Sequence, residues 1–420
     1  MTMKSCPKIL HVSTYDDFGG AAKAASRILQ CQRNIGMDAS MLTMVRQLDR
    51  REIFTPWMND PVRNLRFVRE VLLSHKHYPG TEAGSLLSSG FVSAGISDLL
   101  NTLDCDIVNL HWIINMLSIE EIGAIRKPVV WTLHDMWPFC GNEHYIEIED
   151  FQSSFYSVEQ AVGIGAGDRE DNLSLRSWSA KMERWKDLKL TIITPSEWVS
   201  GLSRKSRLFH KCPTFTIPLP IDAEQEWFPE PRAELHRHFS LPETSKVILC
   251  VAKDLFINRR KGWDFLVEAL GFLASGTTDH DYMLMIAGPD PPKDELQLPI
   301  PVRWLGNLSG PETLRKAYSM ADVVAVPSRM EVFSLTTLEA QACGVPVVAF
   351  DNSGPAGIVR HLQSGWLAPA FNVVDFASGI QWMTGDRDRW MQLSHNSRRN
   401  AIERFSPQVI ANLYLKVYQP

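Results

Sequence analysis

Short apolar runs alternate with longer segments of helical periodicity along the whole chain. Each run is rich in valine, isoleucine or leucine and is bounded by polar, proline or glycine residues, so each predicts a strand. In the first half these runs are 9–12, 39–44, 107–110, 128–133, 190–194 and 214–217. In the second half they are 247–252, 282–287, 302–305, 323–326 and 346–350. Such alternation predicts an α/β fold with doubly wound parallel sheets.

A proline-rich segment separates the two sets of strands. Pro218, Pro220, Pro229 and Pro231 interrupt both helix and strand. A chain of 420 residues is also too long for one ordinary core and is expected to form two domains. We place them at 1–220 and 221–405, with a terminal helix over 406–420, where apolar residues recur at helical spacing.

The segment 327–350 carries the clearest chemical pattern. A helix is expected from Ser334 to Cys343, with Ser334 as its N-cap and Gly344 as its stop. Glu331 precedes this helix and Glu339 lies on it, with an axial rise from Ser334 to Glu339 of about 7 Å at roughly 1.5 Å per residue.

Backbone N–H groups of Phe333, Ser334 and Leu335 are expected to lie between the two carboxylates. A helix N-terminus binds anions through such free N–H groups. The order carboxylate, amide groups, carboxylate predicts a site for a sugar, a diphosphate and a ribose.

The spacing of Glu331 and Glu339 resembles the Glu-x7-Glu motif of retaining glycosyltransferases of family 4, which have the GT-B fold. The resemblance extends over nearly the whole chain and is strongest for the branch that builds bacterial exopolysaccharide and O-antigen units. Its other motifs are GGAAKAA (19–25), TLHDMWPF (132–139), PSEWVSG (195–201), IPLPID (217–222) and KGWDFLVEAL (261–270).

This resemblance implies two Rossmann-like domains facing across a cleft. The first would hold the acceptor, the second the nucleotide sugar, and the helix 406–420 would cross back onto the first. It also implies that Glu331 contacts the transferred sugar, that Glu339 contacts the ribose, and that Lys261 contacts the diphosphate.

Two candidates lie in the first half, each after a predicted strand, where ligands of parallel sheets bind. Gly19 and Gly20 open a helix and permit close approach of a ligand to the backbone. His134 follows the strand 128–133, and the resemblance implies that it contacts the donor sugar. Asp135 either orients the imidazole ring or caps the following turn.

The loop 258–262 holds three consecutive cations, Arg259, Arg260 and Lys261. Cations there would stabilise the charge that grows on a leaving phosphate. The related enzymes also carry an arginine just after the preceding strand; Lys253, Arg259 and Arg260 all remain candidates for that position.

Val332 and Ser334 replace two glycines that are usual in this motif. With cationic side chains and a helix N-terminus available, no metal and no cofactor are expected. Asp-x-Asp pairs at 104–106 and 386–388 stand in the wrong context for a metal site, and no cysteine follows Cys140 closely.

Composition narrows the partners and the compartment. A net charge of −5 argues against nucleic acid. Seven scattered cysteines and the absence of an apolar leader or span predict a soluble, cytoplasmic protein. Trp178, Met182, Trp185 and Leu188 form an apolar stripe among basic residues, which is expected in the core, or else on an anionic membrane surface. The basic amphipathic stretch 63–77 adds to the membrane alternative.

The expected activity is transfer of a hexosyl group from a UDP- or GDP-sugar to a hydroxyl of a glycan or lipid-linked glycan, with retention at the anomeric carbon. The alternatives are a non-enzymatic sugar-nucleotide-binding or scaffold protein, and an epimerase or phosphorylase of the same fold. The base, the sugar and the acceptor stay open, because motif spacing does not encode pocket shape.

Overall fold

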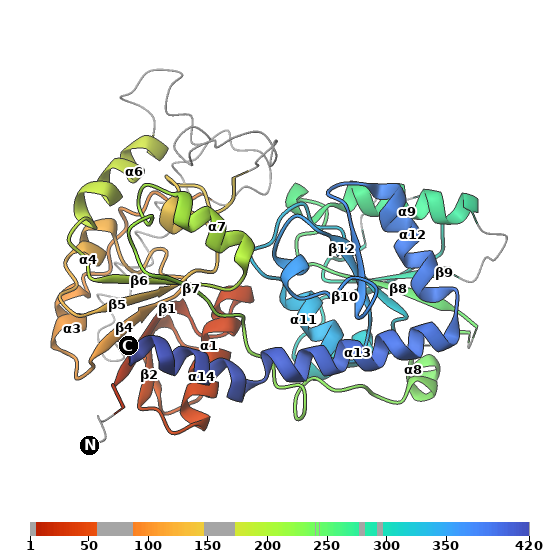
Figure 1. The fold of residues 1–420 in the computed structure, drawn as a ribbon, viewed down its shortest axis with the longest axis horizontal. Helices are drawn as coiled ribbons and strands as arrows, with labels where there is room; N and C mark the ends of the chain where they lie inside the picture. Colours follow the sequence, from red (N-terminus) through yellow and green to blue (C-terminus); the bar gives the residue numbers. More distant parts are fainter. Residues whose placement is uncertain are drawn as a thin grey trace. The chain divides into compact units, whose positions relative to one another are not determined.

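The computed structural model describes residues 6–56, 87–146, 173–239, 241–242, 244–276, 282–291 and 297–419. The chain divides into two compact units, Met1–Leu219 with Ile410–Pro420, and Pro220–Val409. Figure 1 shows a sheet with helices around it in each unit. The basic stretch 63–77 and the segment 147–172 lie outside the described residues.

The first unit contains a seven-stranded parallel sheet in the order β3-β2-β1-β4-β5-β6-β7. Its strands are β1 (Ile9–Tyr15), β2 (Ala39–Val45), β3 (Ile53–Phe54), β4 (Ile107–Leu110), β5 (Val129–Thr132), β6 (Leu190–Thr194) and β7 (Thr214–Thr216). Its helices are α1 (Gly19–Asn34), α3 (Ser97–Thr102), α4 (Ile119–Gly123), η1 (Trp137–Phe139), α6 (Leu173–Arg184), α7 (Glu197–Lys205) and α14 (Pro407–Tyr418). The strand order reverses between β1 and β4, the kind of crevice where ligands bind to open α/β sheets.

The second unit contains a six-stranded parallel sheet in the order β10-β9-β8-β11-β12-β13. Its strands are β8 (Lys246–Val251), β9 (Tyr282–Ala287), β10 (Val302–Gly306), β11 (Val323–Val326), β12 (Val347–Phe350) and β13 (Gly365–Ala368). Its helices are α8 (Arg232–His238), η2 (Arg259–Lys261), α9 (Trp263–Gly276), α10 (Pro311–Met320), α11 (Leu335–Ala342), η3 (Gly354–Gly357), α12 (Val373–Thr384) and α13 (Arg387–Phe405). Ile248, Leu284 and Val348 from the sheet pack with Leu270 and Phe376 from the helices, and all are buried.

The predicted α/β class with two parallel sheets is confirmed, and every predicted strand is present. Strand β1 continues to Tyr15, beyond the predicted end at Val12. The prediction missed β3 and β13 because one has only two residues and the other begins with glycine. Among the described residues, no helix combines the length and apolar character needed to span a bilayer.

The last helix, α14, supplies side chains to the core of the first unit. Tyr414 is buried, and its hydroxyl lies 3.3 Å from Oγ1 of Thr132 at the end of β5. The hydroxyl of Tyr418 accepts a hydrogen bond from Nδ2 of Asn109 on β4 at 2.7 Å. Figure 1 shows α14 in dark blue among the elements of this unit. The terminal residues therefore complete a unit whose other elements all lie before residue 220.

Candidate functional site

The three cations of the second unit lie on the short helix η2, which follows β8. Oδ1 of Asn258 accepts a hydrogen bond from the Arg260 N–H at 3.2 Å and fixes the start of η2. Gly262 ends η2 with φ at +69°. A Cβ atom at this glycine would lie 1.9 Å from the carbonyl oxygen of Pro327, so only glycine lets η2 approach the segment after β11.

This close approach brings Lys261 and Arg260 to Glu331. Nζ of Lys261 donates to Oε1 of Glu331 at 2.6 Å, and Nη1 of Arg260 lies 3.1 Å from Oε2. The hydroxyl of Ser328 donates to Oε1 at 3.2 Å. The three charged side chains remain between 13% and 23% exposed, so the cluster is neither sealed in the core nor freely solvated.

The charges of this cluster are strongly coupled. Burial alone would raise the pKa of Glu331, but the positive charges of Lys261 and Arg260 outweigh burial and lower the pKa to about 2. Burial lowers the pKa of Lys261, while Glu331 opposes that change. Glu331 is therefore ionised at neutral pH and serves as a hydrogen-bond acceptor rather than as an acid.

Arg329 holds the two segments of this cluster together. Its backbone N–H donates to the Arg260 carbonyl at 2.8 Å, and its guanidinium donates to both oxygens of Asp264 at 2.8 and 2.5 Å. The guanidinium also lies 4.1 Å from the centre of the Phe265 ring. Sequence reasoning missed Ser328 and Arg329, although both directly follow the strand 323–326 at the edge where ligands are expected.

The helix α11 begins as predicted. Ser334 is its N-cap, with Oγ accepting from the Thr337 N–H at 3.2 Å, and Gly344 follows the helix with φ at +73°. Within the described part of the chain, the backbone N–H groups of Phe333, Ser334 and Leu335 have no hydrogen-bond partner. These three donors are thus available to an anion, as expected for the N-terminus of a helix.

Ser334 stands where the related motif usually has glycine, and its φ of +106° lies in a region that only glycine enters easily. A non-glycine residue in this region is strained by roughly 1–3 kcal/mol, and such strain is found most often at ligand sites. Gly354 packs against the neighbouring backbone, where a Cβ atom would lie 2.5 Å from the Phe333 nitrogen. The conformation of this turn is therefore held by its surroundings.

Glu339 lies further along α11, with only 7% of the residue exposed. Its Oε2 accepts a hydrogen bond from the hydroxyl of Tyr318 at 3.2 Å. The structure therefore joins Glu331, Lys261 and Arg260 directly, whereas Glu339 is fixed by Tyr318 on α10. Lys253, Arg259 and Arg260 were the candidates for the arginine that related enzymes carry after the preceding strand. Arg260 lies against Glu331, while Lys253 and Arg259 are exposed.

Gly19, Gly20 and His134 belong to the first unit. Gly19 begins α1 with φ at +80°, and Phe18 before it gives no side-chain cap. His134 lies just after β5, where Nε2 is 2.9 Å from Nδ1 of His111. His111 had not been identified from the sequence; its place directly after the strand 107–110 was the available signal.

Among the described contacts, Asp135 makes no hydrogen bond to His134. Its Oδ1 accepts from the Trp137 N–H at 3.1 Å, which is the turn-capping role left open in the sequence analysis. Its Oδ2 accepts from Nε1 of Trp112 at 3.0 Å and lies 2.5 Å from Nδ1 of His144.

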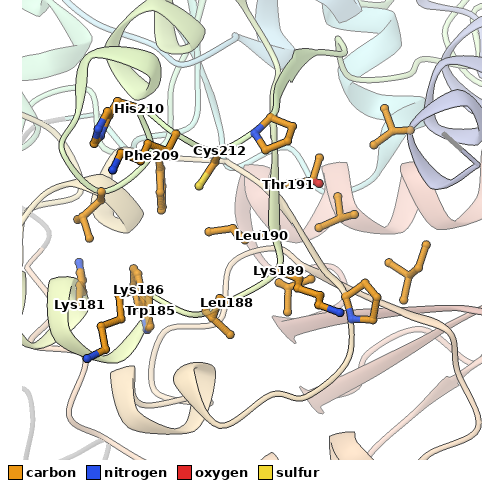
Figure 2. Close-up of a pocket in the computed structure, with 18 of the residues that line it drawn as sticks. Lys181, Trp185, Lys186, Leu188, Lys189, Leu190, Thr191, Phe209, His210 and Cys212 are labelled. Atoms are coloured by element: carbon orange, nitrogen blue, oxygen red, sulfur yellow. The ribbon is translucent and has the colours of Figure 1, made fainter.

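A cavity of about 800 Å³ lies elsewhere in the first unit (Figure 2). Ile107, Val129 and Leu190, the first residues of β4, β5 and β6, line it, so it lies at the sheet edge opposite His134. Its basic lining residues are Lys181, Lys186, Lys189, Arg207, His210 and Lys211.

The helix α6 beside this cavity is largely structural. Trp185, from the predicted apolar stripe, is 5% exposed and packs edge-on against Trp131, so the core interpretation holds for this residue. Lys181 is fully buried, and its ammonium group donates to the carbonyls of Trp137, Cys140 and Gly141. Burial lowers the pKa of Lys181 to about 7.

Comparison with known proteins bears on both units. Residues 231–404 match the family model described as glycosyl transferases group 1. An uncharacterised glycosyltransferase of Methanocaldococcus jannaschii is 30% identical over 210 residues, which cover 48% of this chain and 51% of that protein. A D-inositol 3-phosphate glycosyltransferase of Jonesia denitrificans is 35% identical over 171 residues, 38% of this chain and 40% of that protein. The chain thus matches about half, or less, of the length of these relatives.

The fold is similar over the whole chain to that of solved structures. The Anabaena HepE structure in complex with UDP-glucose superposes with a TM-score of 0.62 at 17% sequence identity, covering 98% of this chain and 99% of that chain. The architecture is therefore GT-B, with two Rossmann-like parallel-sheet domains. The family model matches only residues of the second unit, whereas the similarity of fold extends over both units.

Proposed function

We propose that the protein transfers a hexosyl group from a nucleotide diphosphate sugar, a UDP- or GDP-sugar, to a hydroxyl with retention of anomeric configuration. The observation that carries this proposal is the cluster of Glu331, Lys261 and Arg260 beside the open N–H groups at the start of α11. The glycosyltransferase relatives, and the Anabaena neighbour solved with UDP-glucose, supply the substrate class.

The cluster carries one more positive than negative charge, and the α11 N-terminus adds to it. A diphosphate placed there would meet Lys261, Arg260 and the free N–H groups together. These groups would stabilise the charge that develops on the leaving phosphate. We propose that they also replace a metal ion, so that chelators leave activity unchanged.

Glu331 would bind the sugar rather than transfer a proton to it. Its pKa of about 2 keeps the carboxylate ionised, and the bonds from Lys261 and Ser328 fix its orientation. A carboxylate has about four lone-pair positions, and Lys261, Ser328 and Arg260 use three of them, so a position on Oε2 remains for a sugar hydroxyl. We assign no side chain of the site as a covalent nucleophile. The expected route is therefore front-face substitution, in which the leaving phosphate takes the proton of the acceptor hydroxyl.

Glu339 would accept hydrogen bonds from the ribose hydroxyls. The bond from Tyr318 fixes the orientation of the carboxylate. Its place on α11 puts it beyond the N–H groups of Phe333, Ser334 and Leu335, in the order sugar, diphosphate, ribose.

A panel of nucleotide sugars, screened by thermal shift and then by transfer to hydroxyl acceptors, tests this function. A donor at about 100 times its Kd stabilises the folded state by about 2.7 kcal/mol, which raises Tm by roughly 5–10 °C. Glu339→Gln should weaken donor binding roughly tenfold, since a charged acceptor is lost. Glu403→Gln, at an exposed position on α13, makes the same charge change and should have no effect.

Absence of stabilisation by every nucleotide sugar would refute the proposed function. Tight binding of a donor, with neither transfer nor slow hydrolysis, would instead favour a non-enzymatic sugar-nucleotide-binding protein. The observation that favours this alternative is Val332, which is buried next to Glu331. It replaces a glycine of the related motif with a larger side chain.

We further propose that the acceptor is a glycan or lipid-linked glycan of bacterial surface polysaccharide, reached at the inner face of the cell membrane. Lys186, Lys189, Arg207 and Lys211 are exposed around the cavity of Figure 2 and would attract anionic lipid. Lys186→Glu/Lys189→Glu should abolish sedimentation with phosphatidylglycerol vesicles at low salt. The matched Arg387→Glu/Arg399→Glu pair on α13 should leave it intact, and no vesicle binding by the wild type would remove this contact.

A further inference from the structure

Three histidines of the first unit form a continuous hydrogen-bonded chain. His11 lies on β1, His111 follows β4 and His134 follows β5, and these strands are neighbours in the sheet. Nδ1 of His11 is 2.8 Å from Nε2 of His111, and Nδ1 of His111 is 2.9 Å from Nε2 of His134. The rings stack with centroids 5.1 and 5.2 Å apart.

The inner end of this histidine chain is anchored by two side chains from helices. Nε2 of His11 lies 3.0 Å from Oε1 of Gln32 on α1. Nε2 of Gln32 donates to the hydroxyl of Tyr418 on α14 at 3.2 Å. His11, His111, Gln32 and Tyr418 are all less than 5% exposed, so water does not compete for these bonds.

The order of partners gives the chain a direction. A neutral imidazole has one N–H donor and one nitrogen acceptor, and the partner of one nitrogen determines the state of the other. Because the carbonyl of Gln32 faces His11, Nε2 of His11 carries the proton and Nδ1 accepts from His111. His111 then accepts from Nε2 of His134, which leaves the lone pair of His134 on Nδ1.

Burial keeps these rings neutral. It lowers the pKa of His11 and of His134 to about 4, and it lowers the pKa of His111 well below the usual value, with the two neighbouring histidines adding to the effect. Each ring therefore has one donor and one acceptor at neutral pH, as the directed chain requires.

The outer end of the chain is open. Within the described residues no protein group bonds to Nδ1 of His134, and this ring is partly exposed, unlike His11 and His111. Asp135, the adjacent carboxylate, is engaged by Trp112, Trp137 and His144. Among the described contacts, the tautomer of His134 is set only through His111.

We propose that His111, backed by His11 and Gln32, is a positioning residue that holds His134 as the Nε2–H tautomer, with its Nδ1 lone pair open to a ligand hydroxyl. The contact of His134 with the donor sugar is what the family resemblance implies, and it rests on the proposed function. In this state Nδ1 accepts a hydrogen bond from a hydroxyl and has no proton to offer a phosphate. The chain thereby favours a sugar that donates a hydroxyl hydrogen to Nδ1 over a sugar that lacks that hydroxyl.

Nitrogen-15 NMR of histidine-labelled protein tests the tautomer directly. In the wild type we expect a protonated Nε2 and an unprotonated Nδ1 on His134 at neutral pH. His111→Phe keeps an aromatic ring in the stack but removes both nitrogens, and it should convert His134 to a mixture of tautomers. A protonated Nδ1 in the wild type, or an unchanged His134 signal in His111→Phe, would overturn the proposal.

Two further variants make the result specific. Gln32→Met removes the carbonyl acceptor that holds the proton of His11 on Nε2, at similar side-chain volume, so it should also convert His134 to a mixture of tautomers. His395→Phe, at an exposed position on α13, should leave the signal unchanged.

Donor binding supplies the functional readout. His111→Phe should raise the donor Kd roughly tenfold for the intact sugar, but should not alter Kd for a deoxy sugar that lacks the recognised hydroxyl. A loss of equal size for both sugars would contradict selection through His134. The expected tautomer without binding of any nucleotide sugar would contradict the proposed function while leaving the tautomer assignment intact.

Discussion

Replacement of Lys261 by alanine is expected to lower the rate of sugar transfer by roughly two to three orders of magnitude. Lys261 is the cation closest to Glu331, and its charge would also stabilise the leaving diphosphate. Removal of one preorganised donor to developing negative charge typically costs a factor of about 100 to 1,000 in kcat. Loss of Lys261 would also raise the pKa of Glu331, because one of the two positive charges that lower that pKa disappears.

The structure offers a close control for this experiment. Arg259 lies on the same short helix η2 and is exposed, so Arg259→Ala removes the same charge two positions away. Steady-state kinetics should show a large fall in kcat for Lys261→Ala and a change of less than about threefold for Arg259→Ala. Circular dichroism and donor-free Tm establish that both variants are folded, and equal kcat in the two variants would contradict the role of Lys261.

Mild acid is expected to destabilise the first unit selectively between about pH 6.5 and pH 4. The pKa of His11 and of His134 is about 4 in the folded protein because packing around both rings disfavours their charged form, whereas an unfolded histidine has a pKa near 6.5. As pH falls through this window, the unfolded state binds protons that the folded state does not. Stability is thus complete above about pH 6.5 and is lost toward pH 4, with a cost of about 3 kcal/mol for His11 alone.

Other shifted groups act in different windows. The lowered pKa of Glu331 favours the folded state above about pH 4.5, and that contribution is lost only as pH falls toward 2. The lowered pKa of Lys181 increases the stability of the folded state only as pH rises from about 7 to 10.5. The interval from pH 6.5 to 4 therefore reports mainly on the histidine chain.

Hydrogen exchange resolves the two units in one sample. Peptides from β1 and β4 should lose protection at pH 5 relative to pH 7.5, after correction for the intrinsic pH dependence of exchange. Peptides from β8 and β11 serve as the internal reference, since none of the strands β8 to β13 of their sheet contains a histidine. Equal protection changes in both units would show that the histidines do not control acid stability.

The local elements were predictable because they follow from local physics. Apolar runs with turn signals identified strands such as Tyr282–Ala287, and the Ser334 cap with Gly344 identified α11. Strand β13 escaped because Gly365, its first residue, removes the β-branched signal on which such predictions depend.

The contacts within the site were less predictable because they depend on strand order. Lys261 and Glu331 are 70 positions apart and meet because β8 and β11, which precede their loops, are neighbours in the sheet. The motif suggested that both residues contact a ligand, but it did not indicate that they contact each other. His11, His111 and His134 likewise come together only through the order β1-β4-β5.

The return of α14 to the first unit has a consequence for how the protein is made. Asn109 and Gln32 can form their hydrogen bonds to the hydroxyl of Tyr418 only after residues 220–409 have been synthesised. Domains that are contiguous in sequence mature in order during translation, N-terminal first. Here the earlier unit must remain without its last helix while the later unit is synthesised, so the second Rossmann-like domain is free to finish first.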